Sequence, residues 1–298
     1  DGCPIAHLNL FFIKRNNYTE FHHNNKIFVI MAFLGGLLAS SVTFADFEQA
    51  SNENIVSIGA GAKFYSAPYK GQDAYSEPYP VLDIQLNRFF IKDLTVGYHF
   101  YNHKRVSLAL AANYGRVFLD IDDINTKNSQ MFLGLENRDA AVEVGFVGRF
   151  YSRVGLVEGT FYHDVSDTYD GTHSSLKISR PIPDTGNWTV VPSFYVNYYS
   201  EKYNSYYYGV SAEDNDRGVA LITGTTVSES DFREFRPEYE PGNSGHVGFD
   251  LDIKYAFTNN LKVVANIAIE KFSGEVETSK LTEDKELITS VIGLAYEF

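Results

Sequence analysis

Acidic residues beside a histidine are the first candidates for chemistry in this chain. His163 precedes Asp164, and Asp120, Asp122 and Asp123 cluster upstream. A His–Asp pair can activate a water molecule as a general base. Adjacent residues on a strand, however, point to opposite faces, and no spacing brings the three aspartates to the histidine. We therefore interpret these residues as polar positions near a strand end and predict that the protein is not an enzyme.

Two acidic turns resemble parts of calcium-binding loops. They are residues 164–171 and 214–218, and neither ends in the bidentate glutamate that completes such a loop. The chain has a single cysteine, Cys3, so a cluster of thiolates cannot form. The run Gly59-Ala60-Gly61 lacks the strand–turn–helix context of a nucleotide-binding loop. The sequence thus predicts no metal site and no cofactor.

The charge balance and the tyrosines restrict the partners. Lys and Arg number 25 against 38 Asp and Glu, a net charge of −13, which argues against nucleic acid. The acidic stretch 211–243 contains three arginines, so lipopolysaccharide is a candidate partner through divalent cations and Arg–phosphate pairs. Residues 195–208 include seven tyrosines, which could stack on sugars. We favour an aromatic girdle at a membrane interface instead.

A further set of polar residues alternates with apolar ones along the chain. The set comprises Asp83, Gln85, Glu143, Arg149, Asp250, Asp252, Lys254 and Glu270. If the segments that carry them are strands of a closed sheet, these side chains line its lumen. Their excess of negative charge would then favour small cations.

The segments that carry these residues have a period of two. In 245–257, large apolar side chains face one way and polar ones the other. The chain ends in the same phase, with Ile292, Leu294, Tyr296 and Phe298 on one face. A terminal strand of this kind is typical of transmembrane β-barrels, whose last strand closes on the first. We therefore predict an all-β, antiparallel transmembrane barrel, because lipid leaves no open sheet edge satisfied.

Eleven segments of this kind are visible. They are 55–65, 80–88, 94–101, 105–116, 140–151, 155–165, 172–180, 188–199, 245–257, 261–270 and 287–298. A barrel with both ends in the periplasm needs an even number. Residues 206–210 are the candidate twelfth strand, and twelve is our prediction. The alternative is ten, with 81–101 as one bent strand and 206–210 as a loop.

The strand count also assigns the connecting segments to the two sides of the membrane. With twelve strands, 118–139 is periplasmic, whereas with ten it is extracellular. Under both counts, 66–79, 211–243 and 272–285 are extracellular loops.

The N-terminal region has the composition of a targeting segment. Residues 26–45 combine a lysine, an apolar run and small residues before Asp46, which predicts a signal peptide cleaved after Ala45. A membrane-anchoring helix is the alternative. We expect residues 1–25 to be an upstream extension and 46–298 to be one barrel domain.

Four stretches resemble the MipA/OmpV family of outer-membrane proteins, and within it the OmpV branch. They are 78–90, 206–210, 239–242 and 293–298. One departure is Lys280, where many members have a proline. The resemblance implies a non-enzymatic barrel in the outer membrane of a Gram-negative bacterium. It further implies either a scaffold that binds a lytic transglycosylase and a peptidoglycan synthase, or a role in osmotic response and adhesion.

We accordingly predict a structural or interaction protein of the cell envelope, motivated by this resemblance and by a periplasmic 118–139. The alternatives are a small-solute channel that prefers cations and a surface adhesin that uses the acidic and tyrosine-rich loops.

Overall fold

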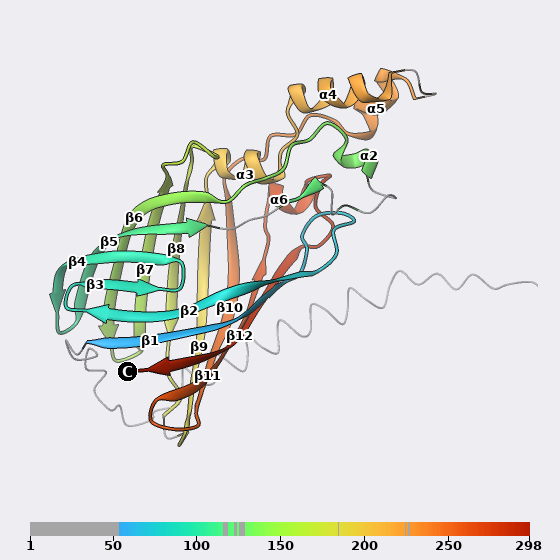
Figure 1. Ribbon diagram of the computed structural model, residues 1–298. Coiled ribbons are helices and arrows are strands. Elements are labelled where there is room, and N and C mark those ends of the chain that lie inside the picture. The colour runs from blue at the N-terminus through green and yellow to red at the C-terminus, as the bar shows by residue number, and fades with distance from the viewer. Residues whose placement is uncertain are drawn as a thin grey trace, which may run out of the picture. The chain divides into compact units, whose positions relative to one another are not determined.

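The computed structural model describes residues 54–115, 119–121, 124, 129–183, 185–223, 225 and 227–298. The predicted extension 1–25 and signal peptide 26–45 lie outside these residues. Within the described part, twelve strands form a closed antiparallel barrel (Figure 1). No helix of the described part is both long enough and apolar enough to cross a bilayer.

The strands follow one another around the barrel in sequence order. They are β1 (Ile55–Tyr65), β2 (Tyr75–Leu86), β3 (Phe89–Lys92), β4 (Thr95–His103), β5 (Val106–Gly115), β6 (Ala141–Ser152), β7 (Gly155–Asp164), β8 (Thr172–Ser179), β9 (Trp188–Tyr199), β10 (Ser244–Ala256), β11 (Leu261–Lys271) and β12 (Glu286–Glu297). The helices lie in the long connections and are α2 (Ser129–Phe132), α3 (Glu201–Tyr208), α4 (Ala212–Ile222), α5 (Glu229–Phe235) and α6 (Glu275–Thr278).

The barrel closes between its first and last strands. Ile58 lies opposite Tyr296, and Ala60 lies opposite Leu294. The period of two sorts the side chains of β12, since Leu294 is 53% exposed on the outer surface while Ala295 is 3% exposed. The outer surface is an apolar belt, and the ladders leave the backbone paired within the sheet, as a lipid environment requires.

The number of strands is as predicted, but the twelfth strand is not residues 206–210. Those residues belong largely to α3, which begins after Ser200, whose hydroxyl accepts a hydrogen bond from the Tyr203 N–H. The additional strand is β3, inside the stretch 81–101. Two tight turns delimit it, and Asn87 and Asp93 adopt positive φ angles of 55° and 52° there. Asn and Asp tolerate this conformation better than other residues with a side chain.

This correction moves segment 118–139 to the other side of the membrane. Because β3 precedes the segment, β5 runs toward the end of the barrel that carries the long loops. Ile124 forms a bridge with Gln72 of the β1–β2 loop, and Gly134 O accepts a hydrogen bond from Arg217 Nε at 2.9 Å. Long loops are extracellular and short turns periplasmic in such barrels. The predicted periplasmic location of 118–139 is therefore wrong.

Candidate functional site

The main buried apolar cluster lies in the extracellular connections rather than between strands. Its members are Tyr69, Leu119, Ile124, Met131, Phe132, Leu135, Ala141, Tyr169, Tyr203, Tyr207, Tyr208, Val210, Phe272, Val276 and Leu281. Fourteen of them come from five separate connections, one of which contains α3, and Ala141 is the first residue of β6. We call this cluster the cap. Its members pack against one another, and Figure 1 shows α3 and α6 at the end of the barrel that carries the long loops, so the cap lies at the extracellular end.

Helix α3 forms the centre of the cap. Its buried residues are Tyr203, Asn204, Tyr207 and Tyr208, which share one face because a helix brings positions four apart together. The Tyr203 ring lies 4.7 Å from Tyr207 and 5.0 Å from Tyr169, measured between centroids. Burial raises the pKa of the Tyr207 hydroxyl, which therefore stays protonated and donates to Asp139 O at 3.0 Å. The spacing of these four residues is the sequence signal for a helix, and the prediction of a strand at 206–210 overlooks it.

A chain of hydrogen bonds joins α3 to the barrel wall. Asn204 Nδ2 donates to Gly242 O at 2.6 Å and to Ser244 Oγ at 3.0 Å. Ser244 Oγ lies 3.0 Å from His246 Nε2, and His246 Nδ1 lies 2.8 Å from Glu270 Oε1. Asn204 and His246 are almost fully buried. The chain fixes the helix above the lumen through polar contacts that tolerate little displacement.

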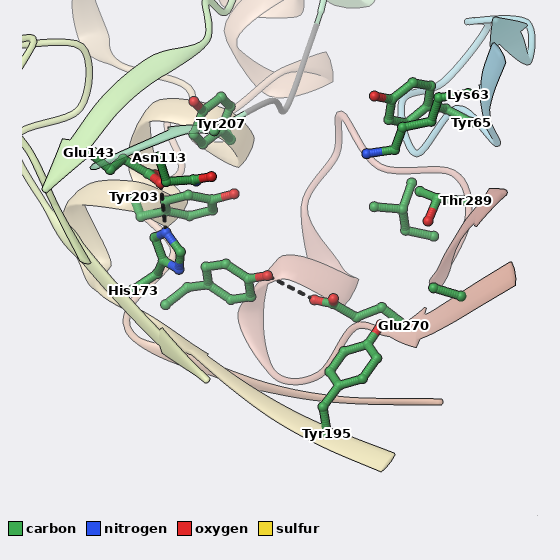
Figure 2. A pocket seen from close by; sticks show the side chains of 14 residues that line it. Lys63, Tyr65, Asn113, Glu143, His173, Tyr195, Tyr203, Tyr207, Glu270 and Thr289 are labelled. Carbon is green, nitrogen blue, oxygen red and sulfur yellow. Dashed lines mark hydrogen bonds and ion pairs between the residues drawn. The ribbon is translucent and has the colours of Figure 1, made fainter. Parts of the chain in front are cut away.

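A cavity of about 220 Å³ lies directly beneath α3. We call it the chamber. It is lined by Lys63, Tyr65, Asn113, Gly115, Glu143, His173, Tyr195, Tyr199, Tyr203, Tyr207, Ala268, Glu270, Leu287 and Thr289. Figure 2 shows Lys63 and Thr289 on one side of the chamber and Glu143 and His173 on the other. Charged groups of opposite sign thus face each other across it.

Glu143 on β6 is the first of two buried carboxylates in the chamber wall. It is 2% exposed and accepts hydrogen bonds from Tyr169 Oη at 2.6 Å and from Asn113 Nδ2 at 2.8 Å. His173 Nε2 lies 3.0 Å from its Oε2 atom. Burial and the adjacent carboxylate raise the pKa of Tyr169, which keeps that hydroxyl a donor. Glu143 therefore links the wall to the 165–171 loop of the cap.

Glu270 on β11 is the second carboxylate. It accepts from Asn197 Nδ2 at 2.8 Å and from Tyr199 Oη at 3.1 Å, in addition to its contact with His246. The Tyr199 bond is drawn in Figure 2. Each carboxylate can accept about four hydrogen bonds. Both are held in place by their protein partners, and Glu143, which has three, retains capacity for a further donor in the chamber.

The other predicted lumen residues do not join this chamber. Near the periplasmic end, Lys254 Nζ lies 3.5 Å from Asp83 Oδ2. Their strands β10 and β2 are separated by β11, β12 and β1, so this pair reaches across part of the interior, and both side chains are about half exposed. Gln85 Nε2 donates to Asn87 O at 2.8 Å in the adjacent turn. The remaining three bind neighbouring side chains: Arg149 Nε with Glu158 at 2.6 Å, Asp250 with Lys177 at 2.5 Å and Asp252 with Asn266 at 2.8 Å.

The residues first considered for catalysis lie in turns and connections or next to them. His163 faces outward and Asp164 inward, so they do not form a pair. Asp164 Oδ2 accepts from the backbone N–H groups of Tyr169 and Asp170 at 2.6 and 2.9 Å, so the calcium-like turn satisfies its own carboxylate. Asp120 belongs to a connection, while Asp122 and Asp123 lie outside the described residues. In the described part no group of three or more His, Cys, Asp or Glu is placed to hold a metal ion.

The arginines of the acidic stretch bind groups within the stretch and in the β5–β6 connection. Arg217 lies 2.5 Å from Asp214, and Arg233 lies 2.5 Å from Asp216. Arg236 is fully buried and donates to Met131 O, Leu133 O, Asp214 O and Asn215 Oδ1 at 2.7–3.0 Å. Burial lowers its pKa to about 10. These bonds join α2, α4 and α5, and the lipopolysaccharide contact offered for these arginines stays a prediction.

The lipid-facing belt, the short turns at one end and the folded loops at the other define the class: the protein is an outer-membrane β-barrel. The profile of the family described as MltA-interacting protein MipA matches residues 58–298, and the chain belongs to that family.

Two relatives match this chain over most of the length of both proteins. "Putative outer membrane protein YiaT" of Escherichia coli K12 is 23% identical over 253 residues, covering 85% of this chain and 94% of the relative. "MltA-interacting protein" of the same strain is 24% identical over 265 residues, covering 89% and 97%. Among solved structures, the outer membrane channel DcaP of Acinetobacter baumannii is 6% identical with a TM-score of 0.35, covering 86% of this chain and 100% of DcaP.

Proposed function

We propose that the protein is a non-conducting, non-enzymatic interaction protein of the outer membrane. The cap is the observation that carries this proposal. Its aromatic cluster lies at the mouth through which a solute would pass, and the Lys254–Asp83 ion pair reaches into the lumen further down. A channel, by contrast, needs a continuous polar path.

The energy of opening supports the same proposal. Tyr203, Tyr207 and Tyr208 are each at least nine-tenths buried. Exposing three such side chains costs on the order of 4.5 kcal/mol, if each counts as ~1.5 kcal/mol like a small buried apolar side chain. Since ~1.4 kcal/mol is a factor of ten, the open fraction stays below about one in a thousand. The predicted cation-preferring channel is therefore the less favoured function.

The proposed partner follows the name of the relative. MltA-interacting protein is named for an interaction, and we infer that this chain likewise binds an envelope enzyme of the lytic transglycosylase kind. Since 118–139 is extracellular, the described periplasmic surface consists of short turns. These carry Arg88, Lys104, Arg105 and Arg153, all exposed, in a chain whose net charge is −13. We propose this basic rim as the contact with a periplasmic partner.

Two measurements test the function. In planar bilayers the purified protein should give no discrete conductance steps, whereas a Tyr203→Ala/Tyr207→Ala variant, which removes the centre of the cap, should give them. Steps from the unaltered protein would contradict the proposal. In pull-downs from envelope extracts, lytic transglycosylases should be enriched over an unrelated outer-membrane barrel, and equal recovery would remove the interaction role.

A further inference from the structure

The outer face of the barrel has an apolar hollow across strands β4 to β7. Its volume is about 270 Å³, and its lining includes Phe100, Leu108, Phe146, Gly148, Gly159 and Phe161. We call this hollow the notch. None of its described lining residues is charged, and Phe146 and Phe161 are 55% and 48% exposed. The notch therefore opens toward the lipid and not toward the lumen.

Two glycines on neighbouring strands form the floor of the notch. Gly148 of β6 lies opposite Gly159 of β7, and two residues away Phe146 lies opposite Phe161. Because side chains alternate along a strand, both glycines occupy outward positions in phase with these exposed phenylalanines. Two adjacent positions of the apolar belt thus lack a side chain, and the phenylalanine rings bound the space that is left.

Neither the backbone nor the packing requires glycine at these two positions, and neither residue has a positive φ angle. A Cβ atom on Gly148 would lie 3.5 Å from Leu108 Cδ2, an ordinary contact, and the nearest atom to one on Gly159 would be 4.0 Å away. At Gly145 of the same strand, by contrast, a Cβ atom would collide with Phe161 O. Glycine inside a strand is less stabilising than alanine, so the chain keeps this space open at a cost in stability.

The periplasmic turns of the same strands are basic. The β4–β5 turn consists of Lys104 and Arg105, and the β6–β7 turn contains Arg153; all three are exposed, and neither turn contains an acidic residue. Gly148 lies five residues before Arg153, which is ~17 Å of strand at ~3.3 Å per residue and ~13 Å of depth at a tilt of ~40°. The notch therefore lies about halfway up an apolar belt of ~25 Å, one leaflet above the cations.

We propose that the notch binds one acyl chain of an anionic phospholipid of the periplasmic leaflet, whose phosphate lies at Lys104, Arg105 and Arg153. Charge-assisted hydrogen bonds from the arginines hold the phosphate. The end of the acyl chain then lies in the notch, because the distance from the turns to the notch is the depth of one leaflet. A second copy of this chain fits the site less well, since a symmetric contact would bring the same basic turns together and like charges repel.

The experiment adds phosphatidylglycerol, with a photoactivatable group near the end of one acyl chain, to the purified full chain in detergent. Crosslinks mapped by mass spectrometry should saturate with lipid concentration and concentrate on peptides that contain residues 100–108 and 146–161. Phosphatidylcholine with the same acyl chain has no net charge and should label these peptides weakly. An Arg105→Gln/Arg153→Gln variant should lose this preference for phosphatidylglycerol.

Filling the notch tests the acyl-chain site itself. A Gly148→Leu/Gly159→Leu variant should reduce the labelling about tenfold, which corresponds to ~1.4 kcal/mol. A Gly148→Ala/Gly159→Ala variant, whose Cβ atoms have room, should reduce it by a smaller factor and decides the matter if the leucine variant does not fold. Heat-modifiable migration of each variant shows that its barrel is folded.

Ala60→Leu is the matched control and should leave the labelling unchanged, because Ala60 is an exposed small residue of β1, which β2 to β5 separate from β6. Equal labelling of the filled-notch and Ala60→Leu variants would overturn the proposal, as would equal labelling by the two lipids. A dimer that forms only when the notch is open would assign the notch to a second copy and overturn it too. The notch variants leave the basic rim and the cap intact, so this inference and the proposed function fail separately.

Discussion

Replacing both prolines of β2 tests, through stability, why the chain lacks a backbone donor at positions 78 and 80. In a Pro78→Ala/Pro80→Ala variant, each alanine adds an N–H group that points away from β1, because Asp93 N donates to Leu82 O on that side, and among the described residues no strand pairs with positions 78 and 80 there. An unsatisfied donor costs ~1–3 kcal/mol, and each lost proline adds ~0.4–1 kcal/mol by releasing the unfolded chain. The free energy of unfolding should therefore fall by ~3 to ~8 kcal/mol.

The measurement is urea unfolding of the protein in lipid vesicles, followed by tryptophan fluorescence of Trp188. Pro68→Ala is the control, because Pro68 lies in the β1–β2 loop, where its carbonyl accepts from Glu283 N at 2.9 Å. The control should lose only the ~0.4–1 kcal/mol of the unfolded-state effect. A double variant no less stable than the control would show that the N–H groups find partners, which would refute this reasoning.

Two further predictions concern the extracellular segments. Arg236→Met leaves the carbonyls of Met131, Leu133 and Asp214 without their buried donor, at a cost of ~1–3 kcal/mol for each group left unsatisfied. Helices α4 and α5 should therefore become susceptible to limited proteolysis, while the heat-modifiable migration of the barrel is retained. Cleavage no faster than in the unaltered protein would contradict this role of Arg236. The pKa values of Tyr69, Tyr169 and Tyr207 are raised by burial, so the folded cap holds its phenolic protons more tightly than the unfolded chain. Its stability should be constant below pH ~10 and fall above it by up to ~1.4 kcal/mol per pH unit for each tyrosine. Hydrogen exchange of cap residues measured between pH 8 and 11 checks this prediction. A free energy of cap opening that stays constant from pH 10 to 11 would contradict it.

The alternation of apolar and polar residues predicts most of the barrel strands from the sequence alone. Long strands such as β10 and β12 present many alternating positions, and their pattern survives occasional exceptions. β3 has only four residues, too few for a periodic pattern, and it was hidden inside 81–101. The two prolines before it were a usable sign, because a proline in a strand indicates an edge.

The misread residues 206–210 show where strand propensity fails. Three tyrosines followed by glycine and valine favour a strand by composition. The spacing of Tyr203, Asn204, Tyr207 and Tyr208 favours a helix, and packing against the cap decides the outcome. One misplaced strand then reversed the side assigned to 118–139, because topology counts strands in order.

The chamber could not be predicted from the sequence, for a different reason. Alternation assigned Glu143 and Glu270 to the polar face of their strands. That both border one cavity depends on the register of β6 and β11, which are separated by four strands. The donors that hold them include Tyr169 from a loop, which no periodic pattern locates. Their function stays a prediction.

The way in which the cap is assembled has a consequence for biogenesis. Fourteen of its fifteen core residues come from five connections around the rim, and the other, Ala141, begins β6. We therefore expect membrane insertion and circular closure to come first and the lid to condense last. If the lid seals the bore as proposed, a newly inserted molecule is unsealed until this step, and substitutions that slow this final collapse should make cells leaky while leaving the mature protein unchanged.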